Sequence, residues 1–192
     1  MNLKDAIYGR RSVRQYQNRS VDKAIIQEIL EGACMAPSGI NLQPWYFLAI
    51  TSEEKRNRFM SYMNETYKNF RPTLEKRFAA NPEVIEETGN FLTTLGNAPV
   101  VILAFLQKSK NIGDEAPLIM SVAAAIENML LMAYEKGLAS CLITSPVDFG
   151  PAERIRAEFA PEQGKLLGAI VLGYSDLSPK APRRREGRFE II

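Results

Sequence analysis

Two clusters of arginine lie near opposite ends of the chain. The first is Arg10-Arg11-Ser12-Val13-Arg14, which holds three guanidinium groups and a hydroxyl within five residues, and the second is Arg183-Arg184-Arg185. Guanidinium groups pair bidentately with phosphate oxygens, and a hydroxyl or a backbone N–H can fill the remaining acceptor positions. The clusters therefore indicate either a shared phosphate site or a solvated basic face, because short basic clusters are weakly specific motifs.

The chain contains no histidine. This excludes Ser-His-Asp and Cys-His catalysis, His-ligated metals and imidazole acid/base chemistry. Cys34 and Cys141 form no CxxC pair, and we expect no metal site. If the protein is an enzyme, we expect an organic cofactor, because cofactors bring reactive centres that side chains lack.

Composition and charge narrow the class of protein further. With 192 residues, 46% of them hydrophobic, the chain is long enough for one substantial core, and we expect a single domain over residues 1–192. The formal net charge of +2 gives no global field that would attract nucleic acid or an anionic membrane. The start Met-Asn-Leu-Lys-Asp lacks the organisation of a signal peptide, so we expect a cytoplasmic protein.

Helices and strands are expected to alternate along the chain. A short helix is predicted behind Asn2, and a second from Val21 to Ala33 with Ser20 as its N-cap. Apolar runs predict strands at 45–50, 98–105, 138–144 and 166–174, with a charged turn at 107–115 and a short helix from about Pro151. Segment 55–96 is predicted to hold two helices, broken near Arg71-Pro72 and Asn81-Pro82. This alternation is typical of a layered α/β or α+β domain.

The segment 116–134 is apolar nearly all round and long enough to raise the question of a membrane span. Glu127 and Asn128 at its centre would be costly in hydrocarbon, while Pro117 and Gly137 suit the two ends of a soluble helix. We therefore expect no membrane span. The segment is predicted to be a helix buried in its own core or against a partner subunit.

Residues 175–192 are predicted to form an extended arm. The arm is punctuated by prolines, carries the second arginine cluster and ends in Phe189-Glu190-Ile191-Ile192. An unstructured tail would not usually finish with three large apolar residues out of four. The arm is expected to pack against another surface, and the edge of a partner subunit's sheet is the obvious candidate.

Five segments, in order along nearly the whole chain, resemble the nitroreductase family of flavin enzymes. They are Arg10-Arg11-Ser12-Val13-Arg14-Gln15-Tyr16, the run from Ala36 to Trp45, Gly137-Leu138-Ala139-Ser140, Leu172-Gly173-Tyr174 and the basic arm. The resemblance implies an α+β fold with a central mixed sheet surrounded by helices and a domain-swapped C-terminal arm. It also implies a homodimer that binds one FMN in each of two clefts at the subunit interface, with NADH or NADPH as electron donor.

The same resemblance implies roles for individual residues. Arg10, Arg11 and Ser12 match the segment that holds the FMN phosphate and ribityl chain, and Arg14 matches a cation near N1 and O2 of the flavin ring. Arg183 and Arg185 match the C-terminal phosphate contacts, with a register uncertainty of one that admits Arg184.

Two further segments of the chain match the parts of the family that meet the flavin ring. Pro37, Ser38 and Gly39 match the loop that the other subunit lays against the ring, and Asn41 either joins that site or bonds its own loop. Thr144 and Ser145 align with the segment whose backbone approaches N5 and O4. Glu127 and Asn128 are left as either a satisfied polar step in the dimer interface or a direct flavin contact.

These matches predict an FMN-dependent oxidoreductase that passes electrons from NAD(P)H to nitroaromatic or quinone acceptors by a ping-pong mechanism. Arg14 is the candidate catalytic group, because a cation there stabilises the negative charge of the reduced flavin. The alternatives are a specialised member, acting as a flavin reductase, enone reductase or reductive dehalogenase, or a flavin-binding protein without turnover. Segment 55–96, which contains Tyr62, Tyr67, Phe70 and Phe78, could form a lid over the acceptor.

Overall fold

The computed structural model describes residues 2–107 and 115–192, so most of the charged turn predicted at 107–115 lies outside the described residues. Its centre is a four-stranded sheet in the order β1-β2-β4-β3. The strands are β1 (Trp45–Ile50), β2 (Val100–Leu106), β3 (Ala139–Ile143) and β4 (Leu166–Gly173), and each neighbouring pair is antiparallel. The α+β class is confirmed. The mixed character expected of the sheet is limited, within the described chain, to one parallel bridge between Ser12 and Ser140.

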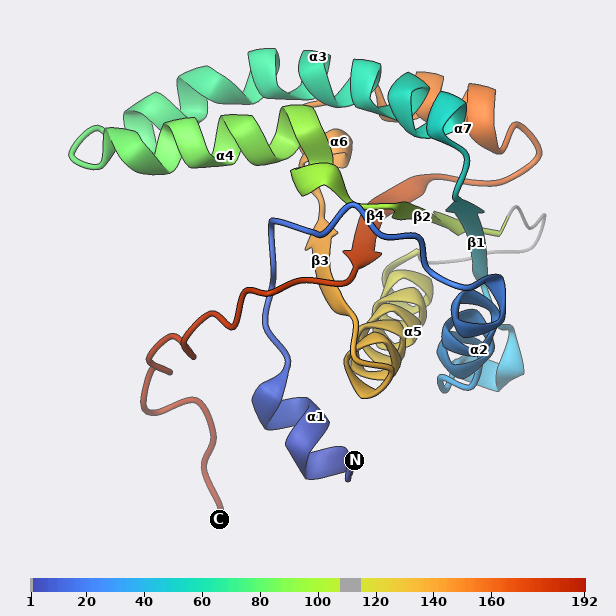
Figure 1. Ribbon diagram of the computed structural model, residues 1–192. Coiled ribbons are helices and arrows are strands. Elements are labelled where there is room, and N and C mark those ends of the chain that lie inside the picture. Colours follow the sequence, from blue (N-terminus) through green and yellow to red (C-terminus); the bar gives the residue numbers. More distant parts are fainter. Residues whose placement is uncertain (1, 108–114) are drawn as a thin grey trace.

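Helices cover both faces of the sheet (Figure 1). One face packs against α2 (Lys23–Cys34) and α5 (Ala116–Glu135), and the other against α3 (Glu53–Arg77), α4 (Pro82–Thr94) and α7 (Ala152–Phe159). The central strand β2 is buried on both faces. Ile102 packs into the core on the side of α2 and α5, and Leu103 packs into the core on the side of α3, α4 and α7. Successive side chains of a strand point to opposite faces, so a strand buried on both faces is apolar throughout.

The long apolar segment at 116–134 forms α5, as predicted. The helix has the length and composition of a membrane span, but it lies against the sheet and buries residues such as Val122, Ala125 and Met129 completely. Core helices of soluble proteins have the same composition. The structure therefore accounts for the apolar character of α5 by burial in the core.

Two details of the predicted helices are wrong. The N-cap of α2 is Asp22 and not Ser20, because the Asp22 side chain accepts a hydrogen bond from the Ala24 N–H. The break predicted at Arg71-Pro72 is absent, and Pro72 lies inside α3. Lys68 and Pro72 are both exposed, so water can reach the Lys68 carbonyl that a proline leaves without a donor. The break at Asn81-Pro82 is confirmed, since α4 begins at Pro82.

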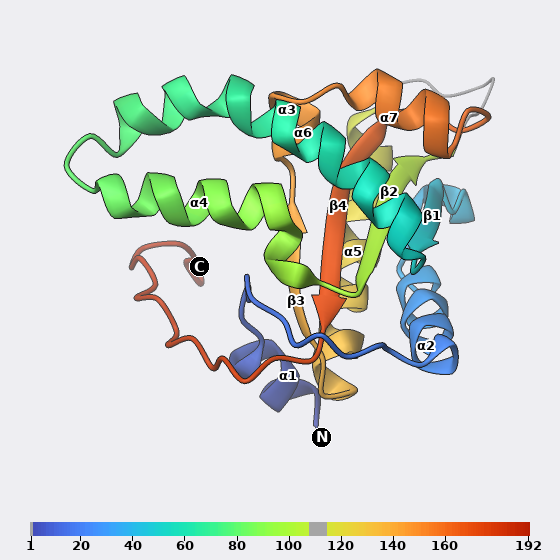
Figure 2. The same cartoon turned by 45° about the horizontal axis from the view of Figure 1, so that its top comes forward.

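The remaining short elements connect the layers. They are α1 (Leu3–Gly9), η1 (Gly39–Asn41), η2 (Leu95–Asn97) and α6 (Ser145–Asp148), of which only α1 was predicted. Figure 2 shows the hairpin of α3 and α4 extending past the edge of the sheet, with the C-terminal arm leaving beside the N-terminal segment. The hairpin is held at its base by Phe70, whose ring stacks on that of Phe149 at 4.2 Å.

The start of the C-terminal arm is tied to the N-terminal segment. Gln17 donates from its N–H to the Tyr174 carbonyl at 2.8 Å and from its side chain to Asp176 at 2.6 Å, and the Ser175 hydroxyl donates to the Gln15 carbonyl at 2.7 Å. Beyond this anchor the arm is exposed, including Phe189 and Ile191. Its exchange onto a partner therefore stays a prediction.

A polar clasp joins α3 to α7 on the surface. Arg58 donates from Nε and Nη2 to the Glu158 carboxylate at 2.8 and 2.7 Å, and the Tyr62 hydroxyl donates to the same carboxylate. Hydrogen bonds from Arg58 and Tyr62 hold the pKa of Glu158 below its usual value. The clasp therefore stabilises the fold above the pKa of the unfolded Glu158, and this contribution is lost as the pH falls through the folded pKa.

Glu158→Gln is expected to lower the free energy of unfolding at pH 7 by at most about 1 kcal/mol, because both partners are partly exposed to solvent. In acid, where the wild-type carboxyl is itself protonated, the difference should disappear. Urea unfolding at a series of pH values measures this, with Glu75→Gln as the control, since its ion pair with Arg71 lies within one helix. A loss that is the same at every pH would contradict the linkage.

Candidate functional site

The segment from Arg10 to Gln17 runs along the free edge of β3 and carries the first arginine cluster. Ser12 bridges Ser140, and the Val13 N–H donates to the Ser140 carbonyl at 3.0 Å. Further along, the Tyr16 N–H donates to the Gly96 carbonyl at 2.8 Å, and the buried Tyr16 hydroxyl donates to the Val13 carbonyl at 2.6 Å. Buried backbone groups are thus paired along the segment, which fixes its register on the sheet.

A cavity of about 290 Å³ lies where this segment, the end of α5 and the start of the arm meet. We call it the Arg10 cavity. Arg10 and Arg11 line it together with Ser140 of β3, Tyr134 of α5 and Pro179 of the arm. Tyr134 packs so closely on Gly9 that a Cβ there would lie 2.3 Å from the tyrosine hydroxyl. Three segments distant in sequence therefore build one pocket.

The walls of the Arg10 cavity hold polar atoms that no protein group satisfies. Arg10 Nε, Arg11 Nε and Ser140 Oγ are buried and have no hydrogen-bond partner among the described residues. Two of the other guanidinium nitrogens have partners: Arg10 Nη2 donates to both Glu127 oxygens at 3.1 and 3.2 Å, and Arg11 Nη1 donates to the Tyr8 carbonyl at 2.8 Å. Buried donors without acceptors are costly unless a ligand or water supplies one. Two guanidiniums and a hydroxyl in this state fit a phosphate group.

Arg14 lies on the same segment but is exposed, and its guanidinium stands 5.8 Å from the centre of the Phe91 ring. The neighbouring thiol of Cys141 is buried. Burial raises the pKa of Cys141, while Arg14 and a hydrogen bond with Ser12 lower it in part. A neutral buried thiol is a poor nucleophile, so Cys141 is a core residue.

The loop with Pro37, Ser38, Gly39 and Asn41 lies elsewhere. It follows α2, on the other side of α5 from α1 (Figure 1). The Ser38 hydroxyl accepts from the Gln43 N–H at 3.0 Å, and the Asn41 side chain accepts from that of Gln43 at 3.1 Å. Asn41 thus bonds a side chain of its own loop, and its part in a flavin site stays a prediction. Within one chain, the structure does not bring this loop to the arginines.

The backbone of this loop is strained. Ile40 has φ 45°, and Asn41 and Gln43 have φ 57° and 48°. A β-branched residue in the left-handed region is unusual, and such strain persists where the surrounding structure or a function requires it. Ile40 is also 93% exposed. The loop therefore presents an apolar side chain outward from a fixed, unfavourable backbone.

The other predicted residues lie at the far end of β3 and on the arm. Thr144 and Ser145 follow β3 at the start of α6, and Ser145 Oγ is buried without a partner among the described residues. Arg183 and Arg185 are exposed on the arm, where Arg183 makes only a loose ion pair with Glu186 at 3.7 Å. The structure thus brings Arg10, Arg11, Ser12 and Arg14 together beside β3, and leaves Arg183 and Arg185 outside the Arg10 cavity.

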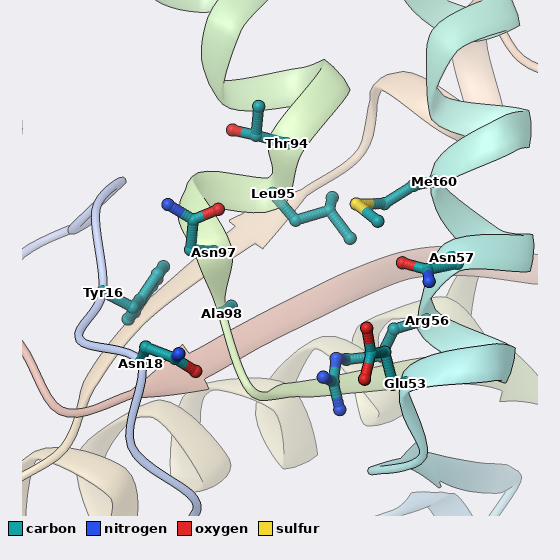
Figure 3. A pocket seen from close by; sticks show the side chains of 10 residues that line it. All are labelled: Tyr16, Asn18, Glu53, Arg56, Asn57, Met60, Thr94, Leu95, Asn97 and Ala98. Atoms are coloured by element: carbon teal, nitrogen blue, oxygen red, sulfur yellow. The ribbon is translucent and has the colours of Figure 1, made fainter.

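Two clefts larger than the Arg10 cavity are lined by side chains that are less suited to bind a phosphate. One, of about 430 Å³, lies between the N-terminal segment, η2 and the start of α3 (Figure 3). Its cation, Arg56, is engaged by two backbone carbonyls, those of Thr51 and Pro99. This engagement ties the corner after β1 to the start of β2, so Arg56 is a structural clamp. The other, of about 520 Å³, lies beside the strained loop and Trp45 and contains no cation among the described residues.

Ser140 and Gly96 were not assigned a role in binding from the sequence, and Glu127 was left with two alternatives. Ser140 is a buried polar residue in an apolar strand, which is the signal that could have indicated it. Glu127 approaches Arg10 only through the packing of α5. Gly96 has φ +59° and supports the backbone of Arg14.

The family model described as "Nitroreductase family" matches residues 7–174 of this chain. The chain belongs to the nitroreductase family. The match includes the arginine segment, the strained loop and all four strands. It ends before the C-terminal arm.

Individual members of the nitroreductase family match nearly the whole chain. A Bacillus subtilis protein provisionally named as an NAD(P)H nitroreductase, YfhC, is 26% identical over 95% of this chain and 89% of its own length. The iodotyrosine deiodinase of Thermotoga neapolitana is 30% identical over 94% of this chain and 93% of its own length. A nitroreductase from Bacteroides fragilis, solved with bound FMN, is 26% identical, with a TM-score of 0.75, and covers 100% of this chain and 99% of its own.

Proposed function

We propose that this chain is an FMN-dependent NAD(P)H oxidoreductase of the nitroreductase family. The observation that carries the proposal is the Arg10 cavity, where two buried guanidinium Nε atoms and the Ser140 hydroxyl find no acceptor among the described residues. The phosphate of FMN would supply those acceptors, with Arg10, Arg11, Ser12 and Ser140 as its ligands. A solved relative with bound FMN and a relative named for NAD(P)H support the choice of cofactor and donor.

The arm would complete the phosphate site. Pro179 already lines the Arg10 cavity, and Arg183 follows it by four residues. Four extended residues span at most about 14 Å, so Arg183 and Arg185 can return to the cavity once an anion is present. We therefore propose one domain whose residues 175–192 form a mobile phosphate-binding arm.

A homodimer would bring the loop from Pro37 to Asn41 to the flavin. Within one chain the loop lies away from the arginines, and the Ile40 side chain is left 93% exposed. Met35, shortly before the loop, and Met120 on α5 are also exposed, at 80% and 72%. A two-fold partner buries each of these side chains once per subunit and places the loop of one subunit beside the arginine segment of the other. The homodimer and the cytoplasmic location remain part of the proposal.

When bound, FMN would take a hydride from NADH or NADPH and return the electrons to a flat acceptor such as a nitroaromatic or a quinone. The residues of the chain would bind FMN and orient it. Arg10, Arg11 and Ser140 would fix the phosphate end, while Thr144 and Ser145, four and five residues further along the chain, would lie toward the ring. Arg14 would stabilise negative charge on the reduced ring. Donor and acceptor would occupy the same face in turn, which is a ping-pong order.

Arg14→Met is expected to lower the two-electron potential of the bound flavin by on the order of 30 mV, or about 1.4 kcal/mol, because one cation near the reduced ring is lost. FMN affinity should change less. Spectroelectrochemical titration measures the potential, with Arg71→Met, on the surface of α3, as the control. An unchanged potential together with weakened FMN binding would contradict this role and indicate that Arg14 contacts the phosphate.

The experiment that tests the proposed function is anaerobic stopped-flow reduction. The purified protein should be yellow, and NADH or NADPH should bleach its flavin absorbance. After the nicotinamide has dissociated, mixing the reduced protein with a quinone or a nitroaromatic should restore the flavin absorbance. A colourless protein that binds no added FMN would overturn the proposal.

Reductive dehalogenation is the second candidate, because a relative with 30% identity over 94% of this chain is named an iodotyrosine deiodinase. The hairpin of α3 and α4 is the segment that could select such an acceptor, since it extends beside the sheet. A halogenated phenol in the stopped-flow panel separates the candidates. Faster reoxidation by the halogenated phenol than by quinones or nitroaromatics would favour this second function.

A further inference from the structure

The carboxylate of Glu127 faces the arginine that the proposed cofactor needs. Glu127 lies on α5, and its two oxygens accept from Arg10 Nη2 at 3.1 and 3.2 Å. The side chains are 26% and 48% exposed for Arg10 and Glu127, so the pair is partly shielded from water. The sequence left Glu127 as either a polar step in an interface or a flavin contact, and the structure shows it engaged with Arg10.

The geometry of a guanidinium gives this ion pair a consequence. A guanidinium can grip an anion through two forks: the Nε and Nη2 edge, or the Nη1 and Nη2 end. Both forks include Nη2. In this chain Nη2 is occupied by Glu127, while Nε is buried and has no partner among the described residues. A phosphate that approaches Nε must therefore share Nη2 with the carboxylate or displace it.

Charge repulsion from Glu127 also disfavours a phosphate at Arg10. A phosphate at the free Nε of Arg10 would lie within a few ångströms of the Glu127 carboxylate, and like charges in a partly shielded site repel. Arg11 keeps only its Nε and Nη2 edge for an anion, because its Nη1 is engaged by the carbonyls of Tyr8 and Arg10 at 2.8 and 2.6 Å, and one edge does not replace the grip that Arg10 shares with Glu127. Glu127 thus removes one of the best phosphate grips that the cavity could offer.

We infer that Glu127 competes with the cofactor phosphate for Arg10 and so limits how tightly the chain retains FMN. The inference rests on the proposed function, since it concerns the phosphate end of the same site. Glu127 acts through Arg10 and is a specificity-determining residue: it sets the preference for a flavin with a phosphate over one without. The competition leaves cofactor exchange possible in a site that contains three arginines within five residues.

The test compares FMN with riboflavin, which lacks the phosphate. Glu127→Gln keeps the shape and one acceptor oxygen but removes the charge, and it should raise the affinity for FMN by roughly three- to tenfold. The affinity for riboflavin should stay unchanged. Fluorescence titration of the apoprotein with each flavin gives both values, and added salt should shrink the difference for FMN because salt screens charge.

Two matched variants sharpen the result. Glu31→Gln on α2 removes one exposed carboxylate that bonds only Gln27 among the described residues, and it should leave both affinities unchanged. In an Arg10→Ala background, Glu127→Gln should raise the affinity for FMN by clearly less, because the contested group is gone and only the charge repulsion remains. Thermal melting of each variant confirms that it is folded.

The outcomes separate the two claims. If the wild type binds neither flavin, the proposed function fails and this inference fails with it. If the wild type binds FMN but Glu127→Gln lowers that affinity or leaves it unchanged, the proposed function stands and the competition is refuted, with Glu127 then positioning Arg10. An equal rise for FMN and riboflavin would also refute it, because the effect would not involve the phosphate.

Discussion

Gly96→Ala is expected to destabilise the fold by more than about 2 kcal/mol and to weaken FMN binding at the same time. Gly96 has φ +59°, and a Cβ there would lie 2.2 Å from the Arg14 carbonyl oxygen and 2.7 Å from its carbon. These atoms are backbone, so the segment that carries Arg14 must move. The Gly96 carbonyl also accepts from the Tyr16 N–H at 2.8 Å, and the shift would strain that bond. Urea unfolding and FMN titration measure the two effects.

Gly137→Ala provides the matched control. Gly137 also has a positive φ, +73°, but nothing lies within 4 Å of the Cβ position. This substitution should cost only the backbone strain of about 1 kcal/mol, and because Gly137 also lines the Arg10 cavity, it is a control for stability and not for FMN binding. If both alanine variants lose the same stability, the contact with the Arg14 backbone has no role.

Deletion of residues 186–192 is expected to reduce the melting temperature, the dimer affinity and FMN retention together. Phe189, Ile191 and Ile192 are 89%, 92% and 111% exposed in the single chain, so they stabilise nothing without a partner. Burial of such side chains is worth about 1.5–3 kcal/mol each before the cost of ordering the arm. We expect the dimer dissociation constant to rise at least about tenfold. The exposed arm would then deliver Arg183 and Arg185 less often to the phosphate.

Sedimentation and melting curves with and without FMN measure the effect of the deletion. A variant with serine at positions 189, 191 and 192 keeps the length of the arm and removes only its apolar groups, so it should behave like the deletion. A truncated protein that remains dimeric, keeps its flavin and melts at the wild-type temperature would show that the arm is only a tail.

The secondary structure could be predicted well where local sequence dominates. The run from Trp45 to Ile50 and the apolar segment of α5 were identified correctly, because burial on one or more faces imposes an apolar pattern that the sequence displays. Pro72 was misleading, since a proline in an exposed part of a long helix can be tolerated when water reaches the carbonyl that it leaves free. The N-cap of α2 was assigned to Ser20 in place of Asp22, a shift of two residues that only the hydrogen bond resolves.

The chemistry of the candidate site was determined by the sequence alone: the absence of histidine points to a cofactor, and the order of Arg10, Arg11, Ser12 and Arg14 points to a phosphate. The sequence also determined family membership, because the order of the motifs along the chain can be read without a structure. Only the tertiary structure decided which groups meet. It placed Ser140 and Glu127 beside Arg10 and put the loop from Pro37 to Asn41 on the other side of α5. The physical reason is that contacts between residues far apart in sequence depend on how helices pack on the sheet, which no local pattern encodes.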